Sequence, residues 1–467
     1  MATRLDENWN RLSDYVHKVI RKLERKNITH AEAFLTSTQT TEVTIRNSEI
    51  LTQNKANDSG VGFRVAVDGD KVGFACTNTL NEKAVFEAGE KAFAIAKVSS
   101  RVPNFTLPQA SQIEKVEGLF DSRVAETTVE ETVEVANRAI DAAEGFDKRV
   151  IVKDGRVIYI SGWRGIINTL GVDYEEKETK AMLYLGCGGK QNGEVTSSCY
   201  DLMLKRTANL EPETVGENVG KMVVGLFKPK TLPSFQGTVV FGPEAVSYQL
   251  CDVLIDALKG ENIIARRSAW TEKIEQRVAS QNLTITDSAT LKEGFASRSF
   301  DDEGCPSQNT VLIRKGKLEN FLHHATSANT VKTANTSNAS RFPGGLDMVR
   351  MIVGNGYRAK PEIYPSNLVI KLGNKSREEL LSEIDRGVLI ESMAGFAQEG
   401  SGVISAQLSR AFLIQGGEIQ YPIKGGMVSG VAFDWFKQVS GVSNDSKQFL
   451  NSLVSSLRVE EVKVVSD

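Results

Sequence analysis

The histidines are the first residues to test for metal chemistry, because a catalytic zinc site normally takes three protein ligands, often including two imidazoles from one helix. The chain has 4 histidines. His17 and His30 are in the N-terminal half, and His323 and His324 are neighbours at the end of a predicted hairpin. No His-x-x-x-His pair exists. We interpret His323 and His324 as a strand end with one ring buried; an isolated metal-binding pair is the alternative.

Three consecutive acidic residues precede a glycine in Asp301-Asp302-Glu303-Gly304. Carboxylates can bind hard cations, but adjacent side chains in an extended segment point to opposite faces. A metal site built from these three residues alone is therefore not expected. We predict a solvated turn.

Two other segments resemble catalytic or phosphate-binding loops but have the wrong spacing. Ser401, in Glu399-Gly400-Ser401-Gly402, lacks the Gly-x-Ser-x-Gly elbow of a serine hydrolase. Cys187 lies in Gly186-Cys187-Gly188-Gly189-Lys190, which matches neither glycine-rich phosphate motif. We predict a strand end and turn there, with Cys187 as a buried structural cysteine; a reactive thiol is the alternative.

The N-terminal half shows two cycles of helices and strands. Apolar residues at helical spacing predict helices around residues 9–23, 85–96, 129–143 and 215–226. Alternating or β-branched stretches predict strands, with turns at Asp68-Gly69-Asp70 and at Asp154-Gly155. The predicted strands cover residues 31–35, 42–46, 60–67, 72–75, 150–153, 156–161, 165–169 and 181–186.

The C-terminal half is richer in glycine and in hairpins. Residues 310–323 form one predicted hairpin with a turn at Lys315-Gly316, and residues 410–423 form another with a turn at Gly416-Gly417. A helix is predicted over residues 246–257, after Pro243 in its first turn. We therefore predict an α+β protein. Its N-terminal half is an α/β-type domain of mixed sheets and amphipathic helices, residues 1–232, with an internal linker near 102–113. Residues 233–467 form a β-rich domain with hairpins in a curved sheet.

Composition excludes several classes of protein. The chain has 467 residues and a formal net charge of −3, with no long basic run, which argues against nucleic-acid binding. The polar N-terminus lacks the apolar segment of a secretory signal, and no apolar run is long enough to span a bilayer. We expect a cytoplasmic protein. The 5 cysteines lack a Cys-x-x-Cys pair, which favours buried free thiols.

Three motifs together resemble the TldD/PmbA family of metallopeptidases, and the resemblance covers nearly the whole chain. They are the acidic turn at 301–304 with its following hairpin, the pattern from Leu413 to Pro422, and the glycine-rich run from Gly425 to Gly430. Catalytic members of the family carry His-Glu-x-x-x-His on a helix and a cysteine near the C-terminus. Here Pro243 and Tyr248 occupy the histidine positions, and the last cysteine is Cys305.

The resemblance identifies Glu244 with the catalytic glutamate of the family. A carboxylate of ordinary pKa is a weak base for amide hydrolysis without a Lewis acid. A single carboxylate at a helix N-terminus is also a favourable partner for the helix dipole. We therefore expect the dipole role, with Glu244 as the one weak candidate for catalysis.

In lacking these ligands, the chain resembles the PmbA branch of the family, also called TldE. The resemblance implies a subunit that holds no zinc and pairs with a zinc-bearing TldD-like chain, in a complex that processes unfolded or flexible polypeptides. A homodimer could form when the chain is alone. One alternative is an independent hydrolase or peptidase with an unrecognised site. Another is a non-enzymatic binding protein that modulates DNA gyrase.

A peptidase of this kind is expected to enclose its substrate between two similar subunits. A strand edge can hold a peptide by backbone hydrogen bonds with little regard to its sequence. The glycine-rich run at 395–402 and the hairpin at 410–423 are the candidate walls. The predicted substrate-binding residues are Gly400, Ser401, Gly402 and Phe412.

Overall fold

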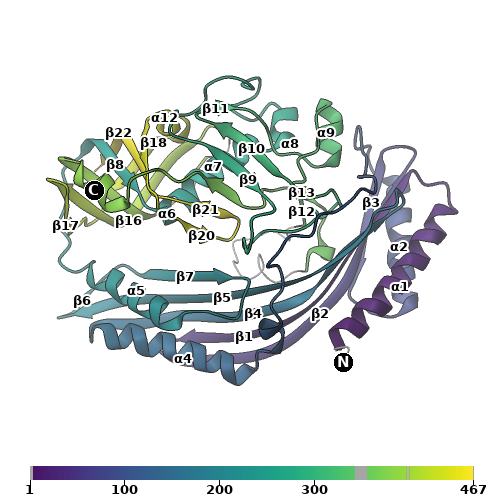
Figure 1. Cartoon of the computed structure of the whole chain (residues 1–467), viewed down its shortest axis with the longest axis horizontal. Helices are drawn as coiled ribbons and strands as arrows, with labels where there is room; N and C mark the ends of the chain where they lie inside the picture. Colours follow the sequence, from purple (N-terminus) through teal and green to yellow (C-terminus); the bar gives the residue numbers. More distant parts are fainter. Residues whose placement is uncertain (1–3, 342–354, 396, 399, 466–467) are drawn as a thin grey trace.

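The fold pairs a long curved N-terminal sheet with a C-terminal β-rich unit that lies against one of its faces (Figure 1). The structure is a computed structural model that describes residues 4–341, 355–395, 397–398 and 400–465. Helices cover the opposite face of the N-terminal sheet. The α+β class predicted from the sequence is confirmed.

The N-terminal sheet has the strand order β3-β2-β1-β4-β5-β6, and β7 pairs with β5. All of these pairs are antiparallel. The strands are β1 (His30–Arg46), β2 (Glu49–Val67), β3 (Lys71–Thr77), β4 (Val150–Asn168), β5 (Asp173–Gln191), β6 (Glu194–Val195) and β7 (Cys199–Lys205).

The helices of this half form where the apolar periodicity predicts them. α1 (Arg4–Glu24) and α2 (Glu82–Val98) pack with β1 to β3, and α4 (Val129–Phe146) and α5 (Pro212–Val224) pack on the outer face further along. A short helix, α3 (Ser122–Glu126), precedes α4. Thr128 begins α4 with a capping box to Glu131, which satisfies two otherwise unpaired backbone N–H groups.

The strands are longer than the sequence predicts, and the turn predicted at Asp154-Gly155 is wrong. Both residues lie inside β4, which pairs with β1 on one side and β5 on the other. A register shift between Val152 and Asp154 accommodates them as a bulge. A Cβ on Gly155 would lie 2.9 Å from Ile45 Cδ1, so the glycine permits close packing and does not mark a turn. The turn predicted at 68–70 is confirmed.

Five strands of the C-terminal unit close into a barrel. β8 pairs with β15 and β22, β18 pairs with β22 and β16, and the β15–β16 pair completes the ring. β17 and β19 extend it at the side. The strands are β8 (Phe235–Phe241), β15 (Arg386–Ala394), β16 (Val403–Gln415), β17 (Glu418–Pro422), β18 (Met427–Val431), β19 (Val439–Val442) and β22 (Leu457–Val465). The predicted curved sheet is confirmed, and its closure removes the strand edges.

A second sheet lies beside the barrel, with the order β11-β10-β9-β14-β21-β20, and β12 and β13 form a separate pair. Its strands are β9 (Ile285–Ser288), β10 (Asn309–Arg314), β11 (Lys317–Leu318), β14 (Leu368–Ile370), β20 (Lys447–Phe449) and β21 (Ser452–Val454), and the separate pair is β12 (Ala339–Ser340) and β13 (Glu362–Ile363). The helices are α6 (Pro243–Ala245), α7 (Cys251–Leu258), α8 (Gly260–Ile264), α9 (Ala325–Val331), α11 (Arg377–Ser382) and α12 (Ala432–Lys437).

Both predicted C-terminal hairpins are confirmed. β10 and β11 are joined at Lys315-Gly316, and β16 and β17 are joined at Gly416-Gly417. All four turn residues have a positive φ, which glycine adopts at no steric cost. The turn residues therefore determine where each strand reverses.

One of the hydrophobic clusters spans both halves. Ile158, Met182 and Leu204 of the N-terminal sheet belong to the same buried cluster as Leu250 and Trp435 of the C-terminal unit. The face of the N-terminal sheet opposite its helices is thus covered by the C-terminal unit. The boundary at residue 232 stays a prediction. In the described part of the chain, no helix has the length and apolarity needed to cross a membrane.

The cysteines form no disulfide. The prediction of buried thiols is correct for Cys187, Cys199 and Cys251, whereas Cys76 is exposed and Cys305 is half-buried. Burial raises the pKa of the Cys187 thiol above its ordinary value, which disfavours the reactive thiolate.

Candidate functional site

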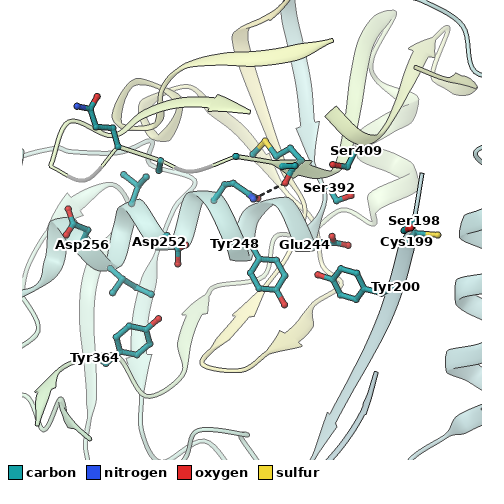
Figure 2. Close-up of a pocket in the computed structure, with 18 of the residues that line it drawn as sticks. Ser198, Cys199, Tyr200, Glu244, Tyr248, Asp252, Asp256, Tyr364, Ser392 and Ser409 are labelled. Atoms are coloured by element: carbon teal, nitrogen blue, oxygen red, sulfur yellow. Dashed lines mark hydrogen bonds between the residues drawn. The ribbon is translucent and has the colours of Figure 1, made fainter. Parts of the chain in front are cut away.

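A cavity of about 740 Å³ lies between the N-terminal sheet and the helical segment that follows β8. We call it the helix cavity. Figure 2 labels residues of this cavity along the helical segment, on and just before β7, on β15 and β16, and just after β13. Its lining residues are Tyr184, Ser198, Cys199, Tyr200, Glu244, Tyr248, Gln249, Asp252, Val253, Ile255, Asp256, Lys259, Tyr364, Ser392, Met393, Ala394, Gly395, Ala397, Gln398, Gly400 and Ser409.

The segment from Pro243 to Leu258 supplies the polar stripe of this cavity. It consists of α6, a π-helical turn at Val246–Leu250 and α7. Pro243 fixes the first turn, where its missing N–H is no loss. Glu244, Tyr248, Asp252 and Asp256 follow at intervals of four residues, and all four line the cavity. Figure 2 shows them in a row along the helical segment.

Glu244 is held by an arginine. Its Oε2 accepts a hydrogen bond from Nη2 of Arg410 at 3.2 Å, and the two side chains are 15% and 7% exposed. Burial raises the pKa of Glu244 above its ordinary value, and the Arg410 guanidinium offsets only part of that effect. The carboxylate is therefore a base with a strong, fixed counter-ion.

Tyrosines surround this ion pair. The rings of Tyr184 on β5 and Tyr200 on β7 are in tilted contact with their centroids 5.4 Å apart, and Tyr200 interacts with both Glu244 and Tyr248. Burial raises the pKa of Tyr248 to about 12. The Tyr248 Oη atom is buried, and it forms no hydrogen bond of normal geometry with the described residues, Tyr200 included. The phenols are therefore neutral and can donate or accept hydrogen bonds.

The two aspartates further along the stripe differ in their partners. Asp256 accepts from the Asn262 side chain at 2.7 Å and from Gly400 N at 2.9 Å. Asp252 has no hydrogen bond or ion pair with any residue that the structure describes, although it is exposed to the cavity. Burial by the surrounding protein raises the pKa of Asp252 to about 6, against the opposing effect of Lys259.

The other side of the cavity is formed by the end of β15 and the segment after it. Gln249 Nε2 donates to the carbonyl of Met393 at 3.0 Å, which ties this segment to the helix (Figure 2). Beyond Ile390, β15 has no further pairing with β8. Ser392, Ala394 and Gly395 line this wall together with the longer residues Met393 and Gln398. The backbone that no longer pairs with β8 suits contact with an extended ligand.

The predicted substrate-binding residues do not lie together. Gly400 lines the helix cavity. Ser401 is exposed and donates to the Gln398 carbonyl, while Gly402 packs against the Phe433 ring. Phe412 lines a neighbouring cavity instead. The predicted wall at 395–402 includes Phe396 and Glu399, which lie outside the described residues.

The neighbouring cavity encloses about 790 Å³ and shares Glu244 with the helix cavity. Arg410 and Phe412 of β16 line it, together with Lys447 and Asp201, which form an ion pair. The Glu244–Arg410 pair thus stands between two cavities at the junction of the two halves.

The prediction of a solvated turn at Asp301-Asp302-Glu303 is wrong, because all three side chains are buried. Glu303 pairs with Arg64 at 2.6 Å, and Asp302 pairs with Arg164 at 2.6 Å. These arginines come from the N-terminal sheet, so the acidic turn joins the two halves. Burial favours the neutral form of Glu303, but Arg64 and other partners bring its pKa below its ordinary value.

The histidine pair is also more buried than predicted. His323 and His324 are only 4% and 8% exposed, so both rings are inside the protein. His324 Nδ1 accepts a hydrogen bond from Ser327 N and thereby caps α9. Burial lowers the pKa of His323 to about 4. Within the described residues, no three His, Cys, Asp or Glu side chains gather in an arrangement that could hold a metal ion.

Sequence comparison assigns the chain to a family. Three family profiles match in order: "PmbA/TldA metallopeptidase domain 1" at residues 31–96, the "central domain" at 123–227 and the "C-terminal domain" at 234–466. The chain belongs to the PmbA/TldD family. The helix cavity lies between the parts matched by the central and C-terminal profiles.

The chain is also similar to individual proteins over most of its length. An uncharacterized protein of Methanocaldococcus jannaschii is 29% identical over 83% of this chain and 85% of its own length. Metalloprotease PmbA of Escherichia coli O157:H7 is 25% identical over 93% and 92%. The crystal structure of TldE from Thermococcus kodakarensis has the same fold, with a TM-score of 0.86, 23% identity and coverage of 97% and 100%.

Sequence reasoning selected Glu244 but missed the residues around it. Asp252 and Asp256 could have been found, because they continue the four-residue interval from Glu244 and Tyr248 along a predicted helix. Arg410 and Tyr200 could not, because they come from strands 166 and 44 positions away from Glu244 and only tertiary folding brings them near.

Proposed function

We propose that this chain is the non-catalytic subunit of a two-chain PmbA/TldD-type metallopeptidase. The observation that carries the proposal is the ion pair between Arg410 of β16 and Glu244, which lies on a helical segment without either histidine of the family motif. A guanidinium stands beside the carboxylate that would otherwise act on a metal-bound water.

The side chains present do not fit a zinc ion. Pro243 has no donor atom, and Tyr248 offers a phenol whose pKa is raised to about 12 by burial, so it resists the ionisation that zinc ligation favours. Glu244 is already paired with a permanent cation, and a divalent ion at the same place would be repelled by Arg410. We therefore propose that this chain holds no zinc and that the metal belongs to a partner carrying His-Glu-x-x-x-His.

The proposed substrates are unfolded or flexible polypeptides, handled in the cytoplasm. Enclosing the active site between two similar subunits would exclude folded proteins by size. The helix cavity and its β15 wall face the junction of the two halves, and they are the parts of this chain best suited to contact such a polypeptide.

Reconstitution tests the proposal. We expect the tagged chain, drawn from its own cells, to bring with it a companion of similar length that carries His-Glu-x-x-x-His. Casein-like peptides should be cleaved only when both chains are present. The preparations should come from a host that lacks its own TldD and PmbA.

A matched pair of substitutions separates the two roles. Glu→Gln in the partner's motif should abolish cleavage, because it removes the general base, whereas Glu244→Gln should leave a correctly assembled complex active. The purified wild-type chain without its partner should contain far less than one zinc ion per molecule after dialysis. Chelator-resistant cleavage by this chain alone, or loss of activity in an assembled Glu244→Gln complex, would contradict the proposal.

A further inference from the structure

The helix cavity carries an excess of negative charge once its internal pairs are removed. Glu244 is neutralised by Arg410, which leaves Asp252 and Asp256 as carboxylates and Lys259 as the ammonium among the lining residues. Lys259 Nζ lies 5.4 Å from the centroid of the Tyr364 ring and forms no ion pair with the described residues. The cavity therefore favours a cationic ligand.

Asp252 is the group that lacks a partner. Both carboxylate oxygens of Asp256 accept a hydrogen bond, one from Asn262 and one from the Gly400 backbone N–H, and these bonds stabilise its negative charge. Asp252 has no such bonds within the described residues; its side chain is exposed to the cavity, where the surrounding protein raises its pKa to about 6. Its ionised form is disfavoured there relative to a fully hydrated carboxylate, and an ammonium or guanidinium in the cavity would stabilise it.

Aromatic rings complete the cavity. Tyr364 stands beside Asp252, and Tyr248, one turn away along the stripe, has a buried hydroxyl without a hydrogen bond of normal geometry among the described residues (Figure 2). Tyrosine faces attract cations, and their edges accept the methylene stem of a long side chain. The β15 wall opposite them is lined by the small residues Ser392, Ala394 and Gly395 together with Met393 and Gln398.

From these contacts we propose that the helix cavity binds a cationic group of a peptide, an ammonium or a guanidinium, with Asp252 as its charge partner. This inference rests on the proposed handling of polypeptides by this chain. The cavity then selects which part of a flexible substrate this subunit holds, while the bond is broken in the partner. The two sources of the cation are a lysine or arginine side chain and a free peptide amino terminus.

Peptide binding to this chain alone tests the inference. The probes are short, flexible, alanine- and serine-based peptides with a fluorophore at the C-terminus, and binding is followed by fluorescence polarisation. One set is acetylated at the N-terminus and carries a central lysine, arginine, norleucine or glutamate. A second set carries norleucine and a free amino terminus. We expect lysine or arginine, or the free amino terminus, to strengthen binding at least about tenfold over blocked norleucine.

Substitutions at Asp252 then identify the charge partner. Asp252→Asn should remove most of the tenfold preference, and Asp252→Lys should reverse it in favour of the glutamate peptide. Asp141→Asn is the matched control, because Asp141 is an exposed aspartate on α4, outside the cavity lining. Since Asp252 makes no hydrogen bond with the residues that the structure describes, its replacement should not disturb folding, which circular dichroism checks.

Equal affinity for the lysine, norleucine and glutamate peptides would overturn the inference, as would a preference unchanged in Asp252→Asn. Failure of every peptide to bind at about millimolar concentration would overturn it as well. None of these outcomes bears on partner-dependent cleavage, which the reconstitution measures separately.

Discussion

Removing Arg410 should show how far the ion pair with Glu244 stabilises the fold. Arg410→Met keeps most of the side-chain volume but leaves a carboxylate that is 15% exposed without its cation. At 3.2 Å the attraction between two unit charges is about 5 kcal/mol for an effective dielectric constant of 20. Measured losses on breaking a buried pair are about 3 to 5 kcal/mol.

Protonation of Glu244 limits this loss. Neutralising a carboxyl of ordinary pKa near 4.5 costs about 1.4 kcal/mol for each pH unit above that value, hence at most about 4 kcal/mol at pH 7.5. The wild-type pKa is already raised by burial, so we expect about 3 kcal/mol at pH 7.5.

The sign of the pH dependence follows from proton uptake. A carboxyl whose folded pKa is raised binds a proton in the folded state that the unfolded state lacks, so stability falls as pH rises between the two pKa values. Arg410→Met raises the folded pKa of Glu244 further, so the pH range over which stability falls extends above the wild-type pKa. The loss should therefore shrink to about 1 kcal/mol or less at pH 5.

Urea unfolding measures the effect, with fluorescence of the buried Trp270 and Trp435 as the signal. Glu244→Gln combined with Arg410→Met should restore stability to within about 1 kcal/mol of wild type, because a neutral pair needs no counter-ion. Arg138→Met, which breaks an exposed pair with Glu213, is the control and should cost about 0.5 kcal/mol. A loss at Arg410 as small as this control, or equal at pH 5 and pH 7.5, would refute the reasoning.

Three further outcomes are expected. Glu303→Gln should lower the free energy of unfolding by about 3 kcal/mol, since its partner Arg64 stays buried without a counter-charge at this position. Because the pKa of Glu303 is lowered in the folded state, this loss should be constant above pH 5 and should shrink only below it, as measured by urea unfolding at several pH values. Gly62→Ala should destabilise the fold by about 2 kcal/mol in thermal unfolding, because its Cβ would lie 2.1 Å from the Tyr357 carbonyl oxygen. Gly145→Ala is the control, and with open space around it the change should be neutral or stabilising. Phe412→Asp should weaken assembly with the partner or cleavage, measured by size-exclusion mass and by activity. Wild-type values in both measurements would show that the 410–423 hairpin contacts neither the partner nor the substrate.

Local patterns in the sequence were enough to place most of the elements. Helices with apolar stripes and hairpins with glycine turns depend on neighbours a few residues away, so their periodicity and turn chemistry predict them. The presence of Pro243 and Tyr248 in place of two histidines can likewise be read from the sequence, and it is the basis of the proposal that this chain holds no zinc.

Strand length and burial depended on long-range pairing. Asp154-Gly155 has the composition of a turn, yet β1 and β5 pair with it on both sides and keep it in the sheet. The acidic residues at 301–303 have the composition of a solvated loop, but arginines from the N-terminal sheet compensate their charge and allow burial. No local pattern contains that information, because each partner lies far away in the sequence.

The sequence by itself therefore determined the α+β class, the helices, the hairpin turns and the absence of a His-x-x-x-His pair, since each is encoded within a short segment. Only the tertiary structure brought Arg410 to Glu244, closed the barrel and left Asp252 unpaired among the described residues of the cavity. The physical reason is that charge pairing and burial are set by whichever side chains meet in space. In this chain those side chains come from strands and helices that are distant along the sequence.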